Sequence, residues 1–458
     1  HEEYNHFYDS TTPRCEGFIV DRPPHDSLYF LSQLKAVGNY YKNVSGGKLL
    51  FTADIITNPN SPENGYYTVS DSMEYYAKAD TSLAKLFSEA LNTAKADIEE
   101  YFYGKPFSPD DVVFVVFHAG LGQDISYPYL DPTVYDLKSA YLEESMFKDK
   151  KTNTIVISPA EILDEKIYTG VLLPETQNII YFDVVEDIFY GSDDLCDIQI
   201  GLTGIFAFLL GYELGLPPMF NNDSLSTNYG DSGVGFFGLM DHGSNNGRGV
   251  IPAPPTPWTR SIITGWSNVE KIDYQNNQDT VLIEAYHKSN KIYKIDISEN
   301  EYFILENRSN HIIPGYDIEY LRYLLWDNYL CENCDLNCNG LNVAEIIDRS
   351  LVIEECIENN PLSNERLHYF DVLDTLIKHD PSLILNEGFE NNIFSDLTNY
   401  DLGLPGSGIL IWHITEPLES EYITGVNNDR NNRAIHLEEA DGAVDIGFES
   451  YLFFGNTN

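Results

Sequence analysis

The stretch Gly204 to Met219 reads G-I-F-A-F-L-L-G-Y-E-L-G-L-P-P-M, and the rest of the chain is organised around it. Within it, Ile205 to Leu210 is the most apolar run of the sequence. That run is far too short to cross a membrane, which takes about 18 apolar residues in a row. We therefore predict a buried central helix from Leu202 to Leu214.

A second motif follows this helix after a polar loop. The loop at 221–233 reads N-N-D-S-L-S-T-N-Y-G-D-S-G, and the motif at 236–243 reads F-F-G-L-M-D-H-G. In this order the helix, the loop and the L-M-D turn resemble the core of the M6 family of zinc metallopeptidases, the immune inhibitor A-like secreted proteases. The family pattern is a helix with H-E-F-G-H-x-L-G-L-P-D, a loop, and a turn reading S-L-M-D.

The match keeps the frame of the family motif and loses its reactive groups. The resemblance implies that Phe208 and Tyr212 replace the two zinc histidines, and that Leu209 replaces the general-base glutamate. Pro218 replaces the acidic third ligand, while Met240 corresponds to the Met-turn residue, an apolar floor under the zinc of a working protease. The framework positions that agree with the family are Ala207, Gly211, Leu214, Gly215, Leu216 and Pro217.

These replacements remove the chemistry that a zinc peptidase needs. Residues i and i+4 of a helix project from one face, so two histidines at that spacing grip one zinc. The glutamate between them activates the metal-bound water. Phe and Leu offer no lone pair, and a tyrosine with a pKa of about 10 is a poor ligand at neutral pH. We therefore expect a metal-free pseudo-active site, refilled as hydrophobic core.

Two other interpretations of this stretch remain open. Zinc held by other residues of the same cleft would need groups such as His242, Glu213 or His118. His118 opens the motif H-A-G-L-G-Q, which is similar to a family motif, but a hydrogen-bonded structural histidine at a strand end explains it equally. The last interpretation is an unrelated buried helix followed by a coincidental L-M-D.

Further motifs similar to the family occur in the family order. The resemblance implies an α+β, zincin-like fold: a mixed twisted sheet with a central helix and a Met-turn. Residues 1–308 and 404–458 would form this metallopeptidase-like domain, and 309–403 would be a small inserted domain. The motifs are P-A-P-P-T-P-W-T-R-S-I-I-T-G-W at 252–266, E-Y-F-I-L-E-N-R at 301–308, L-P-G-S-G-I-L-I-W-H-I-T at 404–415 and H-L-E-E-A-D-G-A-V-D-I-G at 436–447.

Hydrophobic periodicity predicts the remaining elements. Apolar residues at helical spacing indicate helices at 27–41 and 70–103. Asp111 to Phe117 is a continuous apolar run and is typical of a buried central strand. The other predicted strands are 15–21, 48–56, 154–158, 178–185, 281–285, 291–295 and 301–308.

Six cysteines bear on the compartment of the protein. Four of them lie in the inserted segment with the spacing C-x2-C-x3-C-x17-C. Two local disulfides in a secreted chain, a structural zinc site and free thiols are all compatible with this spacing, and connectivity is not readable from sequence. The remaining two form a candidate long-range pair. The six are Cys15, Cys196, Cys331, Cys334, Cys338 and Cys356.

Three acidic segments are candidate calcium sites. Asp335, Asn337 and Asn339 offer oxygens at positions 1, 3 and 5 of an EF-hand or dockerin-like loop, although Glu345 sits one position early for the twelfth ligand. A plain Asn-rich turn is the other interpretation of that segment. The terminal turn and the loop before the Met-turn supply the further candidates Glu438, Glu439, Asp441, Asp445, Asp223 and Asp231.

Composition limits the partners. The chain of 458 residues carries 27 basic and 72 acidic side chains, a formal net charge of −45, so phosphate-rich partners are repelled. We expect no nucleic-acid partner and no membrane span. The start at His1 without a signal-peptide pattern indicates a mature or excerpted segment.

These observations combine into one expectation about function. We expect a secreted, extracellular M6-like pseudopeptidase that binds proteins or peptides, or serves as a structural module in a homo- or hetero-assembly. Calcium is the expected cofactor, and zinc is not expected. The alternative is an active metallopeptidase with a relocated metal site.

Overall fold

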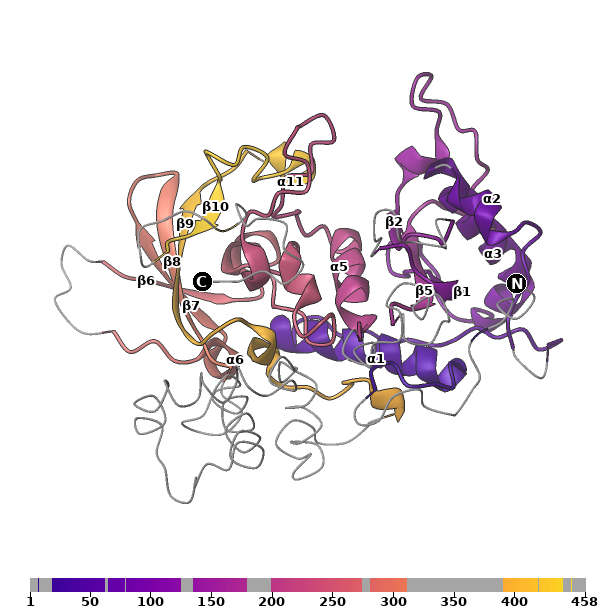
Figure 1. The fold of residues 1–458 in the computed structure, drawn as a ribbon, viewed down its shortest axis with the longest axis horizontal. Helices are drawn as coiled ribbons and strands as arrows, with labels where there is room; N and C mark the ends of the chain where they lie inside the picture. Colours follow the sequence, from indigo (N-terminus) through magenta and orange to yellow (C-terminus); the bar gives the residue numbers. More distant parts are fainter. Residues whose placement is uncertain are drawn as a thin grey trace, which may run out of the picture.

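The computed structural model has an α+β architecture with several sheets (Figure 1). The helices are α1 (Ser27–Val44), α2 (Met73–Ala77), α3 (Asp80–Tyr101), α5 (Thr203–Glu213), α6 (Tyr286–Ser289) and α11 (Glu421–Thr424). The strands are β1 (Val115–Leu121), β2 (Ala140–Leu142), β3 (Ala160–Ile162), β4 (Glu165–Ile167), β5 (Gly170–Thr176), β6 (Asn268–Lys271), β7 (Lys291–Asp296), β8 (Glu301–Arg308), β9 (Gly408–Thr415) and β10 (Ile435–Leu437). The described residues are Phe7, 19–61, 65–78, 80–124, 135–178, 199–273, 281–310, 390–418, 420–439 and Ile446.

The N-terminal half contains a three-stranded sheet with the order β1-β5-β2. β1 and β5 run parallel, with Val115 opposite Val171, and β2 is antiparallel to β5, with Ala140 opposite Leu172. All seven residues of β5 are buried, as expected for a central strand covered on both faces. Helix α3 packs Phe87 and Leu91 into the core beneath this sheet.

The second large sheet has the order β10-β9-β8-β7-β6. Only β6 and β7 are parallel, and the other pairs are antiparallel. β8 alternates between buried and partly buried positions, the pattern of a strand with one core face. β9 pairs with β8 along its whole length, with Tyr302 opposite Ile414, so segments far apart in the sequence lie side by side.

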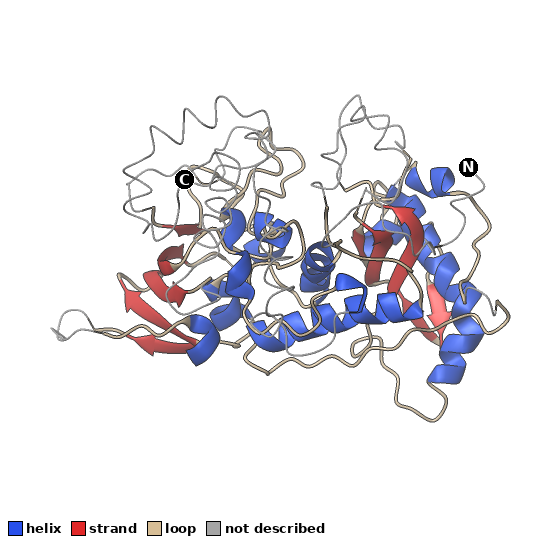
Figure 2. Cartoon of the chain, turned by 60° about the horizontal axis from the view of Figure 1, so that its bottom comes forward, coloured by secondary structure: helices blue, strands red, loops and turns tan. Residues whose placement is uncertain are grey.

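Helix α5 lies between the three-stranded and the five-stranded sheet, and α1 crosses it and contacts it (Figures 1 and 2). The N-terminus of α1 is capped by Asp26, whose carboxylate accepts hydrogen bonds from the backbone of Leu28 and Tyr29. The hydroxyl of Tyr41 on α1 donates to the carbonyl of Ala207 on α5 at 2.6 Å. The main core therefore forms around α5. Its largest buried members are Tyr40, Tyr41, Phe206, Trp258, Tyr302 and Trp412.

A buried network of charged side chains is centred on Glu306 and Arg308 of β8 in the second sheet. Arg308 on β8 donates to Oδ1 of Asp401 at 2.6 Å and to Oε1 of Glu306 at 3.1 Å. Arg260 pairs with the other carboxylate oxygen of Glu306, and Trp412 donates to Glu306 at 3.0 Å. All of these side chains are buried, and each buried charge has an opposite charge in contact, as the cost of desolvation requires.

Several sequence predictions are confirmed. α1 begins at the predicted residue, α5 occupies 203–213 of the predicted 202–214, and β7 and β8 match their segments. The predicted strand at 111–117 is shifted along the sequence: β1 begins at Val115 and ends at Leu121. None of the helices in the described ranges is long and apolar enough to cross a membrane.

Other predicted elements were wrong. Residues 48–56 have no ladder partner, and the segments 154–158 and 281–285 contribute only the isolated bridges of Ile155 and Ala285. The long helix expected at 70–103 is present as two helices, α2 and α3. An apolar run becomes a strand only where a partner strand supplies its hydrogen bonds, and periodicity does not reveal the partner.

Some expectations lie outside the described residues. Residues 19–21 do not form a strand, and 15–18 of that predicted strand are not described. The predicted strand at 178–185 is described only at Asn178. Most of the inserted segment, 311–389, is also outside, so the predicted domain boundaries stay predictions.

Candidate functional site

Helix α5 carries the residues that the sequence singled out, and its C-terminus is sharply turned. Gly215 adopts φ of +73°, a left-handed conformation that favours glycine. The turn lets the backbone N–H of Gly215 reach the carbonyl of Tyr212, and that of Leu216 reach the carbonyl of Gly211, both at 2.9 Å. The chain then leaves the helix through the buried Pro217 and Pro218.

Aromatic rings occupy the face of α5 on which two zinc histidines would have to lie. Phe208 and Tyr212 meet edge to face at 5.2 Å, as the i, i+4 spacing requires. Tyr212 also stacks on Tyr141 of β2, with ring centroids 6.0 Å apart. The ring centroids of Phe208 and Phe220 are 6.3 Å apart. We call Tyr141, Phe208, Tyr212 and Phe220 the aromatic cluster. Leu209 faces the core and is buried.

The phenols of the aromatic cluster are poor metal ligands at neutral pH. Burial, with smaller contributions from Tyr229 and Asp241, raises the pKa of the Tyr212 phenol well above its usual value. Burial and the neighbouring Glu213 likewise raise the pKa of Tyr141. Both phenols therefore stay protonated, and Phe208 has no lone pair to offer.

The L-M-D segment forms the floor beneath α5. Met240 is buried, and a β-carbon placed on Gly211 would lie 2.6 Å from its Sδ. The Met240 carbonyl accepts a hydrogen bond from the backbone of Met219 at 2.9 Å. Asp241 accepts bonds from four donors, which fixes the loop that precedes it. These donors are the Ser232 hydroxyl and the backbone N–H groups of Gly233, Val234 and His242.

The three residues considered as ligands of a relocated zinc each contact different neighbours. Burial raises the pKa of the Glu213 carboxyl, although hydrogen bonds from Tyr141 and Thr169 act to lower that pKa. The ring centroids of His242 and Phe236 are 5.8 Å apart. Burial lowers the pKa of His118, whose Nδ1 lies 3.0 Å from the carbonyl oxygen of Ala119. Among the described residues, none of the three belongs to a group of three or more potential metal ligands.

The calcium candidates that the structure describes are distributed over two regions. Asp223 accepts a hydrogen bond from the backbone of Leu225, and Asp231 pairs with Arg430 at 3.2 Å. Glu438 contacts His413, whereas Glu439 accepts from the backbone of Ile446. Calcium at these positions stays a prediction. Outside the described residues lie Asp335, Asn337, Asn339, Asp441, Asp445, Cys15, Cys196, Cys331, Cys334, Cys338 and Cys356.

Sequence reasoning missed one group of side chains that could hold a metal ion, although it named Glu438 as a calcium candidate. His413 and His436 lie opposite each other on β9 and β10, with Glu438 beside them. Each residue was visible in the motifs I-W-H-I-T and H-L-E-E. No sequence spacing marks them as a set, because only the register of the two strands brings them together.

No model of a known protein family matches this chain, and a search of curated proteins finds no significant match.

Proposed function

We propose that this protein is a non-catalytic, M6-like pseudopeptidase of zincin-like fold, which acts outside the cell as a peptide-binding or structural module. The observation that carries the proposal is the aromatic cluster on α5. Phe208 and Tyr212 stand at the i, i+4 positions where the family resemblance would place two zinc histidines, and their rings contact each other. Leu209, at the general-base position, is buried in the core.

The physical reason is that these replacements are coherent as a set. A histidine pair without its metal would leave buried polar groups without partners, at a cost of about 1–3 kcal/mol each. Exchanging all of the polar groups for apolar or weakly polar ones of similar bulk removes that cost. Met240, in the floor under the helix, lies in close contact with Gly211 of α5.

The adjacent sheet supplies a surface for a peptide. β2 is one of the two edge strands of the described order β1-β5-β2, and its Tyr141 contacts Tyr212 of α5. An edge strand presents backbone N–H and C=O groups to which an extended peptide can add as a further strand. The aromatic cluster beside it offers apolar contacts to side chains of such a peptide. The net charge of −45 favours a neutral or basic peptide over nucleic acid.

The first experiment measures hydrolysis and its metal dependence. Purified protein is incubated with an unfolded protein substrate, with and without a chelator. We expect no cleavage above background. Cleavage that persists through repurification and is abolished by the chelator would overturn the proposal.

A gain of zinc binding tests the resemblance itself. In a zincin-like frame, Phe208→His together with Tyr212→His restores two ligands on one helix face. We expect the double variant to bind zinc measurably tighter in a titration than either single variant. The background is Glu438→Gln, which removes a ligand of the separate histidine group on β9 and β10. Equal zinc binding by the single and double variants would argue against a zincin-like site.

The rival proposal is an active peptidase with zinc relocated within the cleft. Its groups would be His118, Glu213 and His242, which the structure does not gather into one site among the described residues. Loss of bound zinc and of hydrolysis in His242→Ala would favour the rival. Unchanged zinc content and continued absence of hydrolysis would remove its main support.

A further inference from the structure

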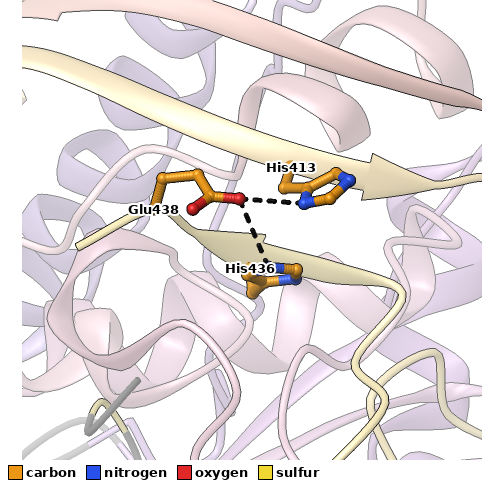
Figure 3. A group of neighbouring side chains, drawn as sticks. All are labelled: His413, His436 and Glu438. Carbon is orange, nitrogen blue, oxygen red and sulfur yellow. Dashed lines mark hydrogen bonds and ion pairs between the residues drawn. The ribbon is translucent and has the colours of Figure 1, made fainter. Parts of the chain in front are cut away.

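The register of β9 and β10 places two histidines side by side. His436 lies directly opposite His413 in the antiparallel pair, and their ring centroids are 5.0 Å apart. Glu438 follows two residues after His436, so its side chain emerges on the same face. Figure 3 shows the three side chains converging, with the Glu438 carboxylate directed toward both rings.

The distances suit one small cation. Oε1 of Glu438 lies 2.8 Å from Nδ1 of His413 and 3.8 Å from Nε2 of His436. One potential ligand atom from each residue lies within 4.8 Å of the other two. Ligand atoms around one tetrahedral zinc are about 3.4 Å apart, given bonds of about 2.1 Å. Small side-chain rotations therefore bring all three atoms into coordination range.

A second carboxylate orients the first histidine. Oε1 of Glu301 lies 2.9 Å from Nε2 of His413, on the side of the ring away from Glu438. A carboxylate that accepts the proton of one ring nitrogen leaves the lone pair of the other nitrogen free for a metal. In that tautomer, Nδ1 of His413 and Oε1 of Glu438 are two acceptors at 2.8 Å. Two acceptors at this distance repel unless a cation or a proton lies between them.

From this geometry we propose that His413, His436 and Glu438 bind one divalent transition metal ion, zinc by preference, with Glu301 as the positioning carboxylate. Two imidazole nitrogens and one carboxylate are a ligand set for zinc and not for calcium, which takes oxygen ligands. The side chains of His413 and His436 are about one-fifth exposed and that of Glu438 is 44% exposed, so water reaches the fourth position.

The metal would stabilise the pairing of the edge strand β10 with β9 in the second sheet. β10 has three residues and pairs only with β9 among the described strands. A metal bonded to His413 on β9, to His436 on β10 and to Glu438, which directly follows β10, adds a cross-link that the short ladder lacks. Because the ion binds the folded pairing, its binding free energy adds to the stability of this edge.

The test is a zinc titration of metal-free, full-length protein by calorimetry, repeated with cobalt(II) to read the ligand field by visible absorption. The background carries Cys334→Ser and Cys338→Ser, because the cysteine cluster is a second potential zinc site. We expect one zinc per chain, a cobalt spectrum of a four-coordinate site with nitrogen and oxygen ligands, and a higher Tm with zinc.

Two substitutions remove ligands, and two leave them intact as controls. Glu438→Gln at a half-exposed position and His436→Gln are each expected to weaken zinc binding by more than about 100-fold and to abolish the zinc-dependent rise in Tm. His242→Gln and the exposed Glu299→Gln remove a histidine and a carboxylate elsewhere, and are expected to change neither. Circular dichroism verifies that each variant is folded.

Glu301→Gln separates a positioning role from a purely structural one. Because Glu301 acts through His413, the variant is expected to bind zinc about 10-fold to 100-fold more weakly and to shift the cobalt bands. Absence of zinc binding to the metal-free protein would overturn the proposal, and so would a zinc affinity in Glu438→Gln and His436→Gln equal to that of the parent. In that case a proton on His413 joins the two carboxylates.

Discussion

The α-carbon of Gly204 packs against the backbone of Ser244: a β-carbon at position 204 would lie 1.9 Å from the Ser244 carbonyl oxygen. The backbone N–H of Gly204 also donates to the carbonyl of Gly249 at 2.7 Å. The N-terminus of α5 is therefore in direct backbone contact with the segment after the L-M-D turn. No side chain fits between them, so this contact sets the position of the whole helix.

Gly204→Ala is expected to destabilise the protein by about 3 kcal/mol or more, because the clash involves backbone and not a flexible side chain. Urea unfolding measures the change. Gly406→Ala is the matched control, since a β-carbon there meets no atom within 4 Å, and its effect is expected to stay within about 0.5 kcal/mol. Similar stabilities of the two variants would show that α5 is not held by this contact.

The contact between Gly211 and Met240 predicts a coupled pair. Gly211→Ala places its new methyl group against the Met240 Sδ, and overpacking of this kind costs about 1–3 kcal/mol. Met240→Ala removes a buried side chain and costs about 2–5 kcal/mol. The double variant relieves the clash, so we expect it to be more stable than the sum of the two losses predicts. Strict additivity in unfolding free energies would contradict the contact.

Truncation of the aromatic cluster tests whether it serves as core. Phe208→Ala is expected to cost about 1–3 kcal/mol, because Phe208 packs on Tyr212 and Phe220 but is only partly buried. Phe206→Ala, two positions away and almost fully buried, is the reference and is expected to cost about 3–5 kcal/mol. If Phe208→Ala cost nothing while peptide binding fell, the cluster would be a binding surface and not core.

The buried network at Asp401 predicts acid sensitivity. Burial disfavours the charged carboxylate, but the Arg308 guanidinium and hydrogen bonds from His287 and Ser309 outweigh it and hold the pKa of Asp401 at about 2. The unfolded value is 3.8, so the stabilisation is present above about pH 4 and is lost as pH falls toward 2. The shift corresponds to about 2 kcal/mol.

Asp401→Asn is therefore expected to lower stability at pH 7 by about 3 kcal/mol, because it leaves the charge of Arg308 less compensated. Between pH 4 and 2 the variant loses less stability than the parent. Denaturant unfolding at several pH values measures both effects. Asp110→Asn, at an exposed carboxylate, should follow the parent curve. An unchanged acid slope in Asp401→Asn would refute the assignment.

Local pattern was sufficient where one segment determines its own structure. The apolar periodicity at 27–41 predicted α1, and the run around Phe206 predicted α5, because a helix satisfies its backbone hydrogen bonds internally. The strands β7 and β8 were also predicted, and β8 alternates regularly between partly buried and buried positions. The absence of histidines at positions 208 and 212 was likewise evident from sequence alone.

Tertiary structure decided everything that depends on a partner. Residues 48–56 and 154–158 have strand-like composition but no neighbouring strand that pairs with them along their length. The stacking of Tyr141 on Tyr212 joins a strand to a helix far along the chain. His413 and His436 meet only because β10 aligns with β9 in one register. A shift of one residue would turn one of them to the opposite face of the sheet, and sequence by itself does not state that register.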